Sequence, residues 1–94
     1  MTNIEDVEEI NVKLECLKAS DKLTSVEALT RANEIVKMIN DVVEIGGVNS
    51  AELYEKARDA YLIASEKVPK DERDMVAFPS NFWSMRSKEE KIRS

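Results

Sequence analysis

Residues 46–69 read GGVNSAELYEKARDAYLIASEKVP, and this stretch carries the clearest helix signal in the chain. Asn49 is placed to cap the amide of Glu52, while Val48 and Leu53 stand at the two positions of a hydrophobic staple. Pro69 closes the element. We predict a helix over residues 50–67, with alanines in its apolar stripe that let a second helix approach closely. The stripe comprises Leu53, Tyr54, Ala57, Ala60, Tyr61, Ala64 and Val68.

Two further helices are predicted before this stretch. Gly46 supplies the stop for a helix over residues 25–45, which opens with a capping box of Thr24 and Glu27. Residues 3–18 carry another amphipathic pattern, with a capping box expected at Thr2 and Glu5. In both segments apolar residues recur every three or four positions. They are Ile4, Val7, Ile10, Leu14 and Leu17, then Ala28, Leu29, Ala32, Ile35, Val36, Ile39, Val42 and Val43.

The connection between these two helices leaves two interpretations open. Residues 1–45 contain neither Gly nor Pro, and the two stripes are nearly in phase, which allows one helix of about 42 residues and 63 Å. Asp21, Thr24 and Ser25 fall where a continuous stripe needs apolar side chains. We therefore favour a break within residues 19–23. The continuous helix would instead form a long hairpin paired with another chain.

The periodicity fails beyond Pro69. One or two helical turns are expected before Pro79, followed by a short helix over residues 80–92. The sequence thus predicts an all-α fold. Residues 1–68 form a small antiparallel three-helix bundle, and residues 69–94 form a proline-punctuated segment with a short fourth C-terminal helix or arm.

Most of the large aromatic side chains lie in residues 77–87, AFPSNFWSMRS. One interpretation is that Phe78, Phe82, Trp83 and Met85 fold back and complete the core, since each aromatic buries roughly 150–250 Å². The other is that the segment docks onto another protein or a neighbouring copy, because Trp, Phe, Met and Arg are enriched at interfaces. The two combine if one face packs inward and Trp83 faces outward.

Several apolar residues lie outside the three predicted stripes, which indicates either a covering fourth element or an interface with another chain. They are Val12, Cys16, Val26, Met38, Ile45, Leu62 and Ile63. Two of these join the aromatic segment in the predicted partner-binding set. That set is Leu62, Ile63, Phe78, Phe82, Trp83, Met85 and Arg86.

Charge and composition limit the class of partner and the cellular compartment that we expect for the chain. Residues 1–66 carry 7 Lys/Arg against 14 Asp/Glu, whereas residues 67–94 carry 7 against 5. Residues 1–66 thus have a net charge of −7, which repels nucleic acid, so no nucleic-acid partner is expected. No apolar run reaches the roughly 18 residues of a membrane span, and the acidic N-terminus is unlike a signal peptide. Cys16 is the only cysteine, so no internal disulfide can form, which fits a reducing compartment. We therefore expect a cytoplasmic protein of a cell or an infected host.

The chain lacks several of the residues and motifs that common catalytic sites use. It has no histidine, so the usual general base near neutral pH and the imidazole metal ligand are missing. Gly46 and Gly47 lack the spacing of a phosphate-binding loop. We therefore expect no catalytic residue, no cofactor, no metal and no enzymatic activity.

The composition favours a non-enzymatic protein-interaction or assembly module that forms a homo-oligomer, of the kind a virus or phage encodes as an accessory or structural protein. The alternative is an acidic inhibitor that covers a basic site on its partner and imitates nucleic acid. Its carboxylate rows would be Glu5, Asp6, Glu8, Glu9 and Glu15, then Glu27, Glu34, Asp41 and Glu44.

Overall fold

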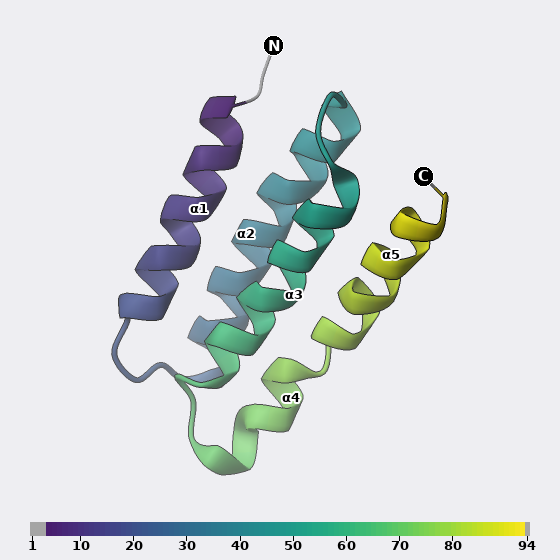
Figure 1. Cartoon of the computed structure of the whole chain (residues 1–94). Coiled ribbons are helices and arrows are strands. Elements are labelled where there is room, and N and C mark those ends of the chain that lie inside the picture. The colour runs from purple at the N-terminus through teal and green to yellow at the C-terminus, as the bar shows by residue number, and fades with distance from the viewer. Residues whose placement is uncertain (1–3, 94) are drawn as a thin grey trace.

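The computed structural model describes the backbone of residues 4–93 and the side chains of residues 6–93. The predicted capping box of Thr2 and Glu5 lies outside the described residues. Within them the chain is helical, without strands, and the predicted all-α fold class is confirmed (Figure 1). The elements are α1 (Ile4–Ala19), α2 (Ser25–Ile45), α3 (Ser50–Ser65), the 3₁₀ turn η1 (Lys70–Glu72), α4 (Arg73–Ala77) and α5 (Ser80–Arg93).

The first two helices are separate, so the alternative of one continuous helix is wrong. Residues 20–24 have no helical conformation and turn the chain back on itself. Two hydrogen bonds attach this loop and the end of α1 to Lys67, just beyond α3. The amide of Leu23 donates to the carbonyl of Lys67 at 2.8 Å, and the Lys67 ammonium donates to the carbonyl of Lys18. The break is therefore held by contacts between elements as well as by the polar residues within it.

The predicted helix ends follow from local chemistry. The capping box of α2 is confirmed in both directions, with Thr24 accepting from the amide of Glu27 at 3.1 Å and Glu27 accepting from the amide of Thr24 at 3.0 Å. Asn49 caps α3 at the amide of Glu52, as predicted. Gly46 follows α2 with a φ of 91°, which side-chain-bearing residues avoid.

The third helix ends two residues earlier than the spacing predicts. The amides of Glu66 and Lys67 donate to carbonyls three residues back, at 3.1 and 3.0 Å, so the last turn tightens before Pro69 is reached. Proline therefore stands beyond the end of α3, at the start of η1.

The core is built around α3, which packs against α2 on one side and against α4 and α5 on the other (Figure 1). Ala57, Ala60 and Ala64 are completely buried, so the predicted alanine stripe of α3 is part of the core. The remaining core comes from the predicted stripes and from two residues of the C-terminal segment, Val76 and Trp83.

The molecule is thin, with principal extents of 38 × 27 × 15 Å. In Figure 1, α1 and α5 lie at opposite edges of the fold, with α2 and α3 between them. Among its described side chains, α1 buries only three apolar residues, Ile10, Leu14 and Leu17. A fold this thin leaves helix faces in contact with solvent, and those faces are the candidates for function.

Candidate interaction surface

The inner face of α4 and α5 attaches the C-terminal segment to α3. Val76, Ser80, Trp83 and Ser87 follow one another at helical spacing, and all four are buried. The Ser87 hydroxyl donates to the carbonyl of Ala51 at 2.9 Å, where the small alanine leaves room for the contact. The segment is therefore an integral part of the fold.

Trp83 lies at the centre of this inner face. Its ring centroid is 5.5 Å from that of Tyr54 in a tilted arrangement, and only 8% of the residue is exposed. Arg86 covers the pair from the side, with its guanidinium carbon 4.9 Å from the Tyr54 ring and 5.8 Å from the Trp83 ring. Arg86 also donates a hydrogen bond to the Tyr54 hydroxyl at 3.1 Å. A cation over two packed rings stabilises this contact beyond its apolar burial.

The opposite face of α4 and α5 presents large apolar side chains to solvent. Met75, Phe78, Phe82 and Met85 are 55%, 73%, 53% and 65% exposed, and we call these four residues the outer stripe. Phe82 stands edge-on to the Trp83 ring at 5.1 Å between centroids, so the buried anchor supports one member of the stripe.

The sequence spacing explains why these four residues share a face. Their numbers rise by three, four and three, which is the pattern of one face of a helix. Adjacent residues are about 100° apart around a helix, so Phe82 and Trp83 point in different directions. Pro79 separates α4 from α5, but Phe78 before it keeps helical dihedral angles, and all four residues of the stripe are exposed.

The seven predicted partner-binding residues separate into three groups. Phe78, Phe82 and Met85 share the outer stripe, whereas Trp83 and Arg86 face α3. The interpretation that all four large residues of the segment complete the core holds for Trp83, which fills the space beside Tyr54, and is wrong for Phe78, Phe82 and Met85, which are exposed. The combined interpretation with Trp83 facing outward is wrong for the same reason. Leu62 and Ile63 belong to α3, where Leu62 is exposed and Ile63 packs partly against the core.

Two features were not identified from the sequence. Met75 extends the outer stripe onto α4, and its spacing of three residues before Phe78 would have shown this. The other feature is the surface that α5 covers. From the sequence, the aromatic segment is expected to cover apolar residues outside the three stripes, but α5 packs on α3 instead. Val12, Val26 and Ile45 therefore remain 59%, 73% and 68% exposed.

A groove runs between α1 and α2 and contains two of these exposed residues, Val12 and Ile45. One hollow of about 440 Å³ lies beside Val12, Cys16 and Ile35, and a second of about 190 Å³ lies beside Met38 and Ile45. Glu9 lines both hollows, so they follow one another along the same seam. We call this surface the α1–α2 groove.

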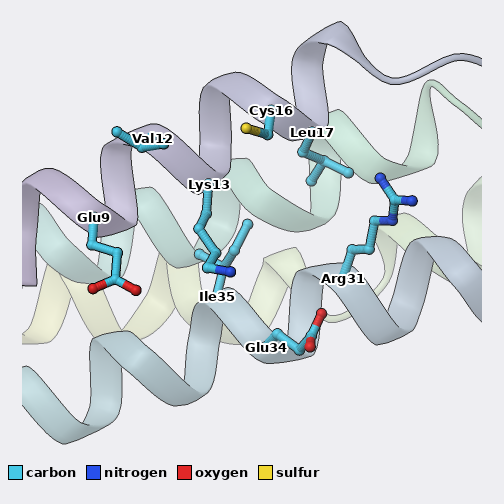
Figure 2. Close-up of a pocket in the computed structure, with 8 residues that line it drawn as sticks. All are labelled: Glu9, Val12, Lys13, Cys16, Leu17, Arg31, Glu34 and Ile35. Atoms are coloured by element: carbon cyan, nitrogen blue, oxygen red, sulfur yellow. The ribbon is translucent and has the colours of Figure 1, made fainter.

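Charged side chains form the rim of the α1–α2 groove. Figure 2 shows Lys13 extending from α1 towards α2, and Arg31 extending from α2 towards α1. Arg31 is fixed there because it donates a hydrogen bond to the Ser20 hydroxyl at 2.9 Å. With four carboxylates against these two cations, the lining has a net charge of −2. The carboxylates are Asp6, Glu9, Glu34 and Asp41.

Within residues 6–93, three side chains have pKa values that the structure shifts from their ordinary values, and each shift has a local cause. Hydrogen bonds with Thr24 at the start of α2 lower the pKa of Glu27. The hydrogen bond and charge of Lys91 lower the pKa of Glu55, which thereby joins α5 to α3. Burial raises the pKa of Tyr61, whose hydroxyl donates to Asn33. Each of these pKa shifts is thus explained by a local contact or by burial within the fold.

Among residues 6–93, no cluster of three His, Cys, Asp or Glu side chains is arranged to hold a metal ion. None of the helices in the described part of the chain has the length and apolar composition that a membrane span requires.

No protein-family model matches the chain, and comparisons with curated proteins and with solved structures also give no significant match. We infer a function from two surfaces, the outer stripe and the α1–α2 groove.

Proposed function

We propose that the chain is a non-enzymatic assembly module that self-associates through the outer stripe of α4 and α5. The observation that carries this proposal is that the segment of α4 and α5 has one buried face and one exposed apolar face. Trp83 fixes the inner face to α3, while Phe78, Phe82 and Met85 stay in solvent. A free aromatic arm would lose much conformational entropy on binding, whereas a stripe on a docked helix is already ordered.

The size of the outer stripe supports the proposal. A side chain of this size offers roughly 200 Å², so the exposed fractions of the four residues amount to on the order of 500 Å² on one copy. Apolar patches of roughly 300–600 Å² are the largest that ordinary monomers carry, and they often mark binding sites. Two such surfaces in contact bury about 1,000 Å², which reaches the lower limit of a specific interface.

The test is sedimentation equilibrium of the full chain and of one double variant. Interfaces near 1,000 Å² bind weakly, so the concentrations should extend from about 5 to 500 µM. We expect the mass of the wild-type chain to rise with concentration above 10.7 kDa. The variant Phe78→Gln/Met85→Gln should remain monomeric with an unchanged circular dichroism spectrum, because both side chains are exposed.

Val26→Gln is the matched control, since Val26 is as exposed as Phe78 but lies on α2 outside the groove. It should associate like the wild type. A wild-type chain that stays monomeric over the whole range contradicts the proposal, as does a stripe variant that associates normally.

The acidic-inhibitor alternative has less support from the arrangement of charges. Glu27 is engaged in the cap of α2, and Glu15 pairs with Lys18 at 3.0 Å. Lys13 and Arg31 stand among the carboxylates of the α1–α2 groove. A surface of interleaved charges resembles a phosphate backbone less than an uninterrupted acidic row does. It suits a partner that also carries both signs, such as another helix.

A further inference from the structure

We propose that the outer stripe of one copy docks into the α1–α2 groove of a second copy, so that assembly proceeds head to tail. This inference rests on the self-association proposed above and specifies its second surface. The occupant of the groove is then α5 of the neighbouring copy, which would complete the face that α1 and α2 leave open.

The two surfaces have matching lengths. The outer stripe extends from Met75 to Met85, which is 10 residue steps and about 15 Å at the rise of a helix. On α2, Ile35 lines one hollow and Ile45 the other, and these two residues are also 10 steps and about 15 Å apart. The two ends of the stripe, Met75 and Met85, would then lie at the two hollows, beside the exposed apolar groups Val12 and Ile45.

The two surfaces also have complementary charges. The lining of the groove has a net charge of −2, as counted above. Helix α5 carries two carboxylates, Glu89 and Glu90, against four cations, which are Arg86, Lys88, Lys91 and Arg93. Because Lys91 pairs with Glu55 of α3, the net charge of α5 together with this partner is +1. Two copies of α5 placed against each other would bring like net charges together. The groove therefore suits α5 better than a second α5 does.

The arrangement of the helices makes this contact heterologous. In Figure 1, α1 and α5 lie at opposite edges of the fold, and in Figure 2 the groove lies between α1 and α2. A copy that offers its stripe to one neighbour thus keeps its groove free for another. Contacts of this type build rings when the rotation closes and open filaments when it does not.

The decisive experiment mixes two variants that each lack one surface. Val12→Gln/Ile45→Gln removes exposed apolar groups from the groove, and Phe78→Gln/Met85→Gln removes them from the stripe. Each variant alone has a single intact surface, so the inference predicts a monomer in both cases. An equimolar mixture restores one stripe and one groove, and it should sediment as a dimer of twice 10.7 kDa.

The outcomes separate this inference from the proposed function. If the groove variant associates like the wild type while the stripe variant is monomeric, the stripes pair with each other or with another surface. The head-to-tail inference is then overturned and self-association stands. A mixture that remains monomeric also overturns the inference. A monomeric wild type overturns both proposals.

Cys16 provides an independent measurement because it is exposed and lines the groove. We expect a maleimide to label Cys16 at least fivefold more slowly at concentrations where the wild type is assembled than where it is monomeric. The stripe variant should be labelled at one rate throughout. If the labelling rate of the wild type stays constant while its mass rises, the groove is not the docking surface.

Discussion

Phe82 and Trp83 are adjacent in sequence but have opposite environments. Trp83 is buried against Tyr54, whereas Phe82 is half exposed on the outer stripe. Residue type alone gives no reason for this difference, because either ring could fill the same space. The position of Pro79 and the register of α5 decide it, by directing residue 83 towards the alanine-rich face of α3.

Replacing Trp83 should therefore reduce the stability of the fold rather than remove a binding contact. We expect Trp83→Ala to lower the free energy of unfolding by about 3 kcal/mol, because a large buried ring is lost and a cavity remains beside Tyr54. Phe78→Ala is the control and should change stability by less than about 0.5 kcal/mol, as exposed positions usually do. Urea unfolding at a concentration where the chain is monomeric measures both.

An equal loss of stability in the two variants would contradict the assignment of Trp83 to the inner face. A small effect of Trp83→Ala combined with lost association would restore Trp83 as the binding residue.

At the scale of single elements, the start of α2 should give the protein a pH-dependent contribution to stability. The hydrogen bonds with Thr24 lower the pKa of Glu27 in the folded state. A carboxyl with a lowered pKa stabilises the fold above its unfolded pKa, near about 4.3, and this contribution is lost as the pH falls through the folded value. Stability should thus decrease between about pH 5 and pH 3.

The variant Glu27→Gln isolates this effect, because Gln retains the reciprocal hydrogen bond of a capping box but does not titrate. We expect its urea midpoint to fall less steeply with acid than that of the wild type, so that the two curves converge at low pH. Glu44→Gln, at an exposed position of the same helix, should follow the wild-type curve. A variant as acid-sensitive as the wild type would show that the cap contributes nothing to the pH dependence.

Removing α5 should unfold the domain. Truncation after Ala77 eliminates Trp83 and Ser87 and exposes Tyr54 and Ala51 on α3. A small domain has little apolar burial to spare, so the loss of one whole packed helix exceeds its margin. Circular dichroism should show a large loss of helix, well beyond that of 14 residues. A truncated chain that keeps its helical signal and melts cooperatively would mean that α5 is an accessory arm.

The helices could be predicted from the sequence, whereas the orientation of the last one could not. Thr24, Gly46 and Asn49 act through hydrogen bonds and dihedral angles within a few residues, so their effects are visible in sequence. Between residues 75 and 85, apolar side chains stand on two opposite faces of the helix, and periodicity does not select which face is buried. The choice depends on α3, through the space beside Ala51 and Tyr54.

The same reasoning explains what was found and missed in the candidate site. The aromatic segment is recognisable from composition alone, because most of the large rings lie there. The α1–α2 groove is a property of two helices and their distance, and sequence reasoning detected only its exposed apolar residues, such as Val12 and Ile45. A surface formed by two helices can be predicted only when the packing of those helices is known.

At the scale of the whole molecule, stability is unevenly distributed. Helix α3 lies between its neighbours and buries half of its 16 residues, whereas α1 lies at an edge and, within residues 6–19, buries only Ile10, Leu14 and Leu17. Local opening costs least where few apolar contacts are lost. Helix α1 should therefore open on its own, while α3 opens only when the whole domain unfolds.

Hydrogen exchange of the backbone amides tests this distribution and its link to assembly. In dilute solution we expect amides of α1 to exchange at least tenfold faster than those of α3. If α5 of a neighbour occupies the α1–α2 groove, it contacts α1 and α2 together and must be released before α1 can open. Protection of α1 should then increase with protein concentration in the wild type, while protection of α3 in the monomeric stripe variant stays constant. Equal protection of α1 and α3 in the monomer would contradict the unequal packing. If the wild type assembles but the protection of α1 does not change with concentration, the neighbour binds elsewhere.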